Sequence, residues 1–176
     1  KGTLIHTRDF MWRLGLNLTH YKNVVTDLPL KDMPVSGVHK LAVGRSVYDF
    51  YMKQWAGVDP ENGDPLWYKN VKDANDKITG RTTTNDYAQA DYYYTGKSSL
   101  PKGYGGFNTA FSYKGFELST IFAYSIGNYI VDRDVTMLWH NGSSTGRAWS
   151  TEILNRWTPE NRYTDVPALK AVSNSW

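Results

Sequence analysis

The sequence predicts an all-β protein, namely a segment of an antiparallel transmembrane β-barrel with about four spanning strands and long extracellular loops. Aromatic residues make up 15% of the chain, as 13 Tyr, 7 Trp and 6 Phe, beside 15 Gly. Strands favour aromatic residues, and turns favour Gly. Several segments of strand length also alternate between apolar and polar residues. In addition, a short turn joins two of these segments at one end, whereas long polar stretches leave them at the other.

The composition excludes several classes of function. The formal net charge is only +3, and the Lys and Arg residues are scattered along the chain, so we expect no nucleic-acid partner. The sequence contains no Cys, which rules out disulfides, thiolate metal sites and a Cys nucleophile. No stretch approaches the roughly 18 apolar residues of a transmembrane helix. If this chain spans a membrane, it does so with strands.

The first spanning strand is predicted near residues 8–24. Even positions there are apolar and odd positions are polar or small. The even positions are Phe10, Trp12, Leu14, Leu16 and Leu18, and the odd positions are Arg13, Gly15, Asn17 and Thr19. A tilted strand crosses the hydrocarbon layer in roughly 9 to 11 residues, which this alternation covers. We expect the even side chains to face lipid and the odd ones to face the barrel lumen.

Two further spanning strands are predicted near residues 104–114 and 116–127. Their apolar positions are Phe107, Phe111, Tyr113, Phe116, Leu118, Phe122, Tyr124 and Ile126, and the residues predicted to face the lumen are Asn108, Ser112, Glu117 and Ser119. Only Lys114 and Gly115 separate the two alternating runs. A link this short that contains Gly predicts a β-hairpin.

A fourth, less regular strand is predicted near residues 45–57. The range 58–103 is rich in Asp, Asn, Thr, Gly and Tyr and contains several turn signals, so we predict a long structured outer loop. A second outer loop is predicted over 128–170, with a short helix within 148–157. The whole chain, 1–176, is therefore interpreted as part of one transmembrane barrel domain.

Short segments in a fixed order carry a resemblance to a known family. These segments are 56–65 (AGVDPENGDP), 100–107 (LPKGYGGF), 113–118 (YKGFEL), 122–127 (FAYSIG), 156–161 (RWTPEN) and 164–167 (TDVP). Together they resemble the SusC/RagA-type TonB-dependent outer-membrane transporters, and the resemblance covers most of the chain.

The resemblance implies a bacterial outer-membrane barrel of about 22 strands, with an internal plug domain. It also implies import of oligosaccharides or peptides, a SusD-like surface lipoprotein as partner, and a TonB complex that binds through an N-terminal segment. The chain shows neither a plug domain nor a TonB-contacting segment. We therefore expect it to be a barrel fragment that needs the rest of the barrel, the plug and outer-membrane lipid. Trp176 is expected to mark a truncated end.

No catalytic, metal or cofactor site is predicted. The four His residues are far apart and form neither an H-x-x-x-H nor an H-E-x-x-H pattern, which argues against a zinc site. A G-x-S-x-G nucleophile elbow is absent, and the glycines at 103–106 precede a strand, not a phosphate-binding helix. We therefore do not expect an enzyme.

Aromatic side chains in the predicted outer loops are the candidate ligand-binding residues. They are Tyr92, Tyr93, Tyr94, Trp139, Trp149 and Trp157. Their rings and polar tips suit a sugar or a peptide. The competing interpretation is structural, because Tyr and Trp also form interfacial girdles and anchor long loops by packing.

The alternative to a transporter is a soluble cell-surface β-sandwich that binds carbohydrate. Half-buried strands of such a sandwich show the same alternation of apolar and polar residues. Exposure of the apolar face discriminates the two, because a sandwich covers that face with a second sheet, whereas a barrel presents it to lipid.

Overall fold

The computed structural model describes residues 1–30, 33, 35–140 and 146–169. The chain divides into two compact units, one made of Lys1–Phe50 and Gly96–Ile130 and the other of Tyr51–Thr95 and Val131–Trp176. The fold is all-β, its pairs of neighbouring strands run antiparallel, and helix is confined to short pieces. Among the described residues, no helix is long and apolar enough to span a bilayer.

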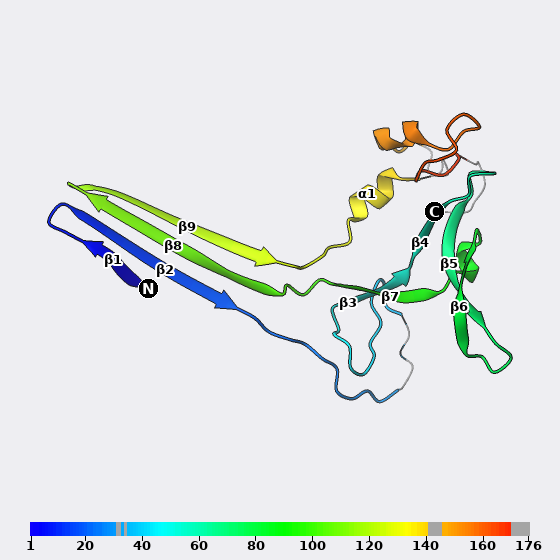
Figure 1. Ribbon diagram of the computed structural model, residues 1–176, viewed down its shortest axis with the longest axis horizontal. Coiled ribbons are helices and arrows are strands. Elements are labelled where there is room, and N and C mark those ends of the chain that lie inside the picture. Colours follow the sequence, from blue (N-terminus) through cyan, green and yellow to red (C-terminus); the bar gives the residue numbers. More distant parts are fainter. Residues whose placement is uncertain (31–32, 34, 141–145, 170–176) are drawn as a thin grey trace. The chain divides into compact units, whose positions relative to one another are not determined.

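The first unit is built on one four-stranded sheet with the order β1-β2-β8-β9 (Figure 1). Its strands are β1 (Gly2–His6), β2 (Phe10–Thr19), β8 (Gly103–Tyr113) and β9 (Phe116–Ile126). The strands β2, β8 and β9 contain 10, 11 and 11 residues. Each is therefore as long as a strand that crosses a bilayer.

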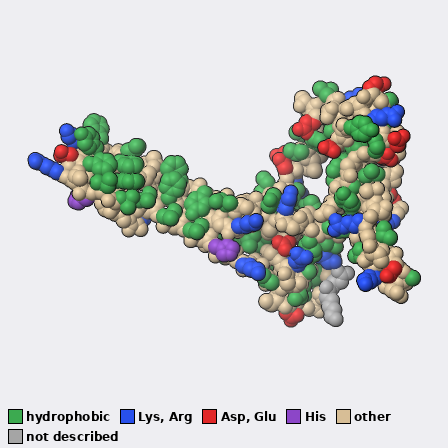
Figure 2. Space-filling model, in the orientation of Figure 1, with side chains coloured by type: hydrophobic (Ala, Val, Ile, Leu, Met, Phe, Trp, Pro, Cys, Tyr) green, Lys and Arg blue, Asp and Glu red, His purple; other side chains and the backbone are tan. Residues whose placement is uncertain are grey.

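The register of this sheet places the apolar side chains of three strands on one face. Phe107, for example, pairs with Leu16 of β2 and with Phe122 of β9. Cross-strand ring contacts follow, since Phe107 stacks on Phe122 at 4.5 Å between ring centres. Trp12 stacks on Phe111 at 5.5 Å. Figure 2 shows hydrophobic side chains gathered along this sheet.

The opposite face of the sheet is mostly polar. The residues predicted to face the lumen share this face through their register: Arg13, Asn17, Thr19, Asn108, Ser112, Glu117 and Ser119. Arg13 Nη2 lies 3.0 Å from Glu117 Oε1 and forms an ion pair across β8. The Asn17 side chain accepts a hydrogen bond from the Gly106 backbone N–H at 2.6 Å. Met11 and Ile121 are the large apolar exceptions on this face, beside the small side chains of Ala110 and Ala123.

The predicted hairpin is confirmed, because β8 and β9 pair along their whole length. Its two central residues, Lys114 and Gly115, have φ values of 45° and 90°. Two consecutive positive φ values are typical of a type I′ turn, whose twist matches that of the strands it joins. Gly115 adopts this conformation without the steric cost that a Cβ brings.

The prediction of one strand over 45–57 is corrected by the structure. This range contains β3 (Asp49–Lys53) and β4 (Trp55–Val58), which belong to different sheets. The strand β3 pairs with β7 (Tyr92–Ser98), and β4 pairs with β5 (Pro65–Lys72). One continuous strand is ruled out because its two halves pair in different sheets, and β4 also has a register shift between Trp55 and Gly57.

The structure also contains strands that the sequence did not predict, in two regions. The first is β1, which the sequence did not predict, because its five residues are too few for a clear alternation and its register is interrupted between Thr3 and Ile5. The second is the range 58–103, which contains β5, β6 (Ile78–Thr84), the 3-10 turn Tyr87–Gln89 and all of β7. This range is thus structured, as its turn signals indicate.

The second unit holds the three-stranded sheet β4-β5-β6, the helix α1 (Arg133–Leu138) and the 3-10 helix η2 (Thr151–Asn155). The short helix predicted within 148–157 corresponds to η2. The buried side chains of this unit are Ala90, Tyr93, Ile153, Val166 and Pro167. Part of the predicted loop 128–170, namely residues 141–145 and 170, lies outside the described residues, as does Trp176.

Candidate ligand-binding site

The three consecutive tyrosines of β7 point alternately to the two sides of the strand, as strand geometry requires. Tyr93 is buried, and its hydroxyl donates a hydrogen bond to Asn70 Oδ1 at 2.9 Å. The Arg81 guanidinium carbon lies 4.2 Å from the centre of the Tyr93 ring. Burial raises the pKa of Tyr93, the charge of Asp91 raises this pKa further, and Arg81 opposes both effects. Tyr93 therefore packs inside the second unit.

Tyr92 and Tyr94 lie on the other side of β7 and both contact Tyr51. The ring centres are 5.6 Å apart for Tyr51 and Tyr92 and 4.7 Å apart for Tyr51 and Tyr94. Lys53 Nζ is 5.2 Å from the centre of the Tyr92 ring. These contacts form an aromatic cluster with one cation above it, and Tyr92 stays 38% exposed at its edge.

Trp157 anchors the turn between β4 and β5. Its indole N–H donates a hydrogen bond to the Pro60 carbonyl at 3.1 Å. Its backbone N–H bonds to the Val166 carbonyl at 2.8 Å. The ring lies so close to Gly63 that a Cβ there would come within 2.7 Å of it. Trp157 therefore ties the Thr158–Pro167 region to the β4–β5 turn, and its ring is engaged in packing.

Trp139 lines the larger of two neighbouring cavities in the second unit, whereas Trp149 does not. The cavity has a volume of about 530 Å³ and is lined by Trp55, Trp67, Val135, Thr136, Trp139, Asp165 and Pro167. Trp55 and Trp67 meet edge to face, with ring centres 5.1 Å apart. Trp149 instead donates its indole N–H to His140 Nδ1 at 2.9 Å. Of the six predicted residues, the structure therefore brings Trp139 alone to this cavity.

The indole N–H groups of the described tryptophans fall into two sets. Those of Trp12, Trp149 and Trp157 donate hydrogen bonds to Thr109, His140 and Pro60. Those of Trp55, Trp67 and Trp139 have no acceptor among the described residues. All three lie in the lining of the same cavity. A buried or half-buried indole usually finds an acceptor, so an acceptor on a ligand would complete their hydrogen bonding.

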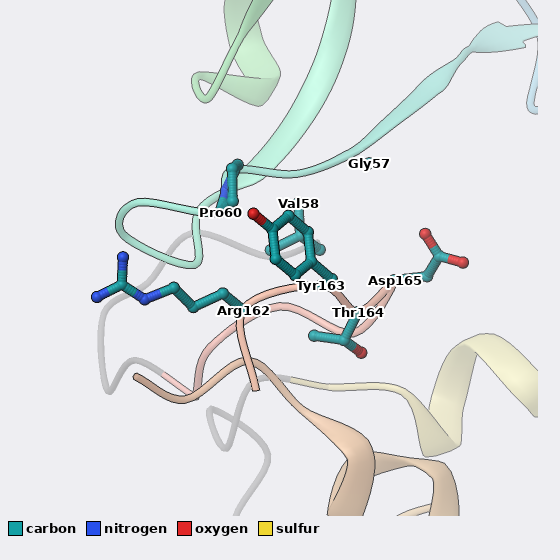
Figure 3. Close-up of a pocket in the computed structure, with 7 residues that line it drawn as sticks. All are labelled: Gly57, Val58, Pro60, Arg162, Tyr163, Thr164 and Asp165. Carbon is teal, nitrogen blue, oxygen red and sulfur yellow. The ribbon is translucent and has the colours of Figure 1, made fainter. Parts of the chain in front are cut away.

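A second, smaller cavity of about 330 Å³ adjoins the first through Asp165, which lines both. It is lined by Gly57, Val58, Pro60, Arg162, Tyr163, Thr164 and Asp165 (Figure 3). Figure 3 shows the Tyr163 ring beside Val58 and Pro60, with the side chains of Arg162 and Asp165 on opposite sides of it. Tyr163 is 92% exposed. The Asp165 carboxylate has no hydrogen-bond or ion-pair partner within the described ranges.

This donor set does not suit a metal. Within the part of the chain that the structure describes, no three His, Asp or Glu side chains converge. A tryptophan-lined cavity with one carboxylate suits organic ligands that carry both an apolar face and hydrogen-bonding groups. These residues support the binding of such a ligand.

The chain is similar to known TonB-dependent receptors. No family model matches the chain. The chain is 28% identical over 182 residues to TonB-dependent receptor P26 of Formosa agariphila, a match that covers 94% of this chain and 18% of the receptor. It is 25% identical over 178 residues to TonB-dependent receptor P3 of the same organism, which covers 93% of this chain and 17% of that receptor.

Solved structures agree. The RagAB peptide importer in its closed-closed state matches with a TM-score of 0.83 and 28% identity, over 98% of this chain and 19% of that chain. The importer in its open-open state matches with a TM-score of 0.75 and 26% identity, over 96% of this chain and 18% of that chain. These similarities support a segment of a TonB-dependent transporter of the SusC/RagA type. It spans less than a fifth of the length of these curated relatives.

The larger cavity of this transporter segment includes residues that the sequence analysis missed. Trp55 and Trp67 flank the turn segment 56–65, and Asp165 lies within the segment 164–167. Both segments were singled out for their resemblance to the family, but nothing in one sequence says that they meet. The structure joins them through the hydrogen bond from the Ala168 N–H to the Gly63 carbonyl at 2.9 Å.

Proposed function

We propose that this chain supplies barrel wall and outer loops to an outer-membrane transporter that imports oligosaccharides or peptides with energy from the TonB complex. The observation that carries the proposal is the two-faced sheet of the first unit. One face is an apolar band of bilayer length, and the other face is polar and hydrogen-bonded. This arrangement is what a wall between lipid and a hydrated lumen requires.

No other element covers the apolar face of the sheet within the described residues of the first unit. Leu16 and Leu18 are each 69% exposed, Phe116 is 82% exposed and Leu118 is 63% exposed. A soluble protein rarely exposes a contiguous apolar surface of this kind. In a bilayer the same side chains contact acyl chains at no cost. A soluble β-sandwich would bury this face under a second sheet, and no sheet covers it among the described residues of the first unit.

The edges of the sheet support a larger barrel. In the described chain β1 and β9 are the outer strands, and an outer strand leaves half of its backbone groups without a neighbour. Such groups cannot stay unpaired in hydrocarbon. We infer that strands from the rest of the transporter pair with both edges and that its plug fills the lumen.

The segments 58–103 and 128–170 form outer loops in this proposal, and the whole chain belongs to one barrel domain. The proposed partners are a SusD-like surface lipoprotein, outer-membrane lipid and a TonB complex that contacts a part of the transporter outside this chain. The relatives support this assignment by their names, since two are TonB-dependent receptors and the RagAB assembly is a peptide importer. Catalysis has no role in it.

Uptake by cells tests the proposal. A strain that lacks the transporter gene is complemented with the intact gene and grown on an oligosaccharide mixture or on peptides as sole carbon source. Growth should return only when TonB is present and the protein is recovered in the outer-membrane fraction. Recovery of the protein in the soluble fraction, or growth that does not depend on TonB, would contradict the proposed function.

A further inference from the structure

We propose that the cavity formed by Trp55, Trp67 and Trp139 is a binding subsite for one pyranose ring of an oligosaccharide. The cavity volume of about 530 Å³ lies within the range of roughly 300 to 1,000 Å³ that is typical of small-ligand sites. The proposal deepens the proposed function by choosing between its two substrate classes. The subsite proposal depends on the proposed function only for the delivery of the sugar to the cavity, because binding does not require transport.

The walls of the cavity supply apolar contact. Three indole rings, Val135 and Pro167 line it. Trp55 and Trp67 lie at an angle of 79° to one another, and the Tyr87 ring also contacts Trp67, with ring centres 4.9 Å apart. Two rings at nearly a right angle form a corner, and the flat C–H face of a pyranose packs against an aromatic ring while its edge stays polar.

The polar groups of the cavity supply both donors and an acceptor. The indole N–H groups of Trp55, Trp67 and Trp139 are donors without acceptors in the described residues. The Asp165 carboxylate is an acceptor only. Thr136 already donates its hydroxyl hydrogen to the Arg133 carbonyl at 2.8 Å, so its oxygen is left to accept. A ligand that satisfies this set must both accept and donate hydrogen bonds around an apolar face.

Sugar hydroxyls meet this requirement, because each one both donates and accepts. A cationic side chain suits Trp faces and a carboxylate, but ammonium and guanidinium groups carry donors only and leave the indoles unpaired. An aliphatic side chain offers neither kind of group. A peptide backbone offers both, but its only ring faces are those of aromatic side chains, which carry at most one polar group each. The pyranose ring therefore fits the cavity best.

The adjoining cavity extends the subsite. Asp165 lines both cavities, and the almost fully exposed ring of Tyr163 stands in the second. An exposed aromatic ring next to a carboxylate is a second stacking platform. A chain of at least two sugar units is therefore expected to bind more tightly than one.

Binding to the intact transporter that contains this chain, purified in detergent, tests the proposal. The probes are a printed array of defined oligosaccharides and an array of random octapeptides, followed by titration calorimetry with the best binder. Trp139→Ala should weaken oligosaccharide binding at least about tenfold, since it removes both a stacking face and a donor. Trp139→Phe keeps the face and loses the donor, so its loss should be smaller. Asp165→Asn should weaken binding as well.

Trp149→Phe is the matched control, because it makes the same chemical change at an indole outside the cavity. It should leave the affinity unchanged. Heat-modifiable migration of each variant on gels reports whether the barrel is folded. Three results overturn the proposal: no oligosaccharide binds, folded Trp139 variants bind the oligosaccharide normally, or the same variants lose binding of peptides only. Normal sugar binding without TonB-dependent uptake would instead overturn the proposed function and leave this subsite in place.

Discussion

The two units of the chain use aromatic side chains in opposite ways. In the four-stranded sheet, rings stack along one exposed face, as Phe107 does on Phe122. In the second unit, rings turn inward, as Tyr93 and Trp157 do, and their polar tips bond to Asn70 and Pro60. The first arrangement makes sense only against an apolar solvent, whereas the second is an ordinary water-soluble core. Aromatic side chains are thus exposed on one face of the first unit and buried inside the second, and we expect mutations in the two units to have different effects.

A charge on the apolar face should have the largest effect. Leu16→Arg should lower the free energy of unfolding of the intact barrel by roughly 2 to 4 kcal/mol, the cost of an Arg near the bilayer midplane. Ser119→Arg, on the polar face of the same sheet, is the control and should cost far less. Reversible denaturation in lipid vesicles measures both. Equal losses for the two variants would show that the faces are not distinguished by lipid.

Crowding the core of the second unit should have the next largest effect. Gly63 has a φ of 75°, and its added Cβ would lie 2.7 Å from the Trp157 ring and from the Ala168 methyl group. Gly63→Ala should therefore destabilise this unit by roughly 1 to 3 kcal/mol. Gly80→Ala, where a Cβ meets nothing within 4 Å, is the control. Limited proteolysis of the intact transporter should cut the second unit faster in the first variant only.

The smallest effect concerns a buried phenol and depends on pH. Because the folded pKa of Tyr93 is raised above its ordinary value of 10.0, the contribution of this group is fully present below pH 10.0. It is lost as the pH rises through the folded pKa, because the unfolded chain ionises first. Tyr93→Phe should cost about 1 kcal/mol at neutral pH through the lost hydrogen bond to Asn70.

Tyr93→Phe should also remove the loss of stability at alkaline pH that comes from ionisation of Tyr93. Denaturation between pH 8 and pH 11, in steps of about one unit, measures the decline, with Tyr163→Phe as the exposed control. An unchanged alkaline decline in Tyr93→Phe would show that another group causes it.

The sheet could be predicted because its physics is local. In β2, β8 and β9 the polarity of each side chain indicates which face of the sheet it lies on. Alternation along the sequence is therefore enough to predict the strands, their faces and the hairpin. The sequence did not predict that β2 pairs with β8, because residues 20–102 separate the two strands and one sequence contains no signal for so distant a pairing. The prediction of one strand over 45–57 was wrong because the interruption between β3 and β4 depends on their different partner strands.

The cavity could be predicted only in part. Trp139 was chosen for its chemistry, as an aromatic residue in a polar region. Trp55, Trp67 and Asp165 join it only after the chain has folded, and no spacing rule brings residues 55, 67 and 165 together. Trp157 has the same chemistry as Trp139, but its N–H is bonded to Pro60. Hydrogen-bond partners, which a sequence does not show, separate the two roles.

One hydrogen bond of the apolar face affects how the sheet sits in a bilayer. The Trp12 indole N–H donates to Thr109 Oγ1 at 2.9 Å, so the indole donor is satisfied without water. An indole with an unmet donor is drawn to the headgroups, where it can be hydrated. Because the Trp12 N–H is already paired, Trp12 lacks this attraction to the headgroups. This ring can therefore lie against acyl chains without leaving its N–H group unpaired.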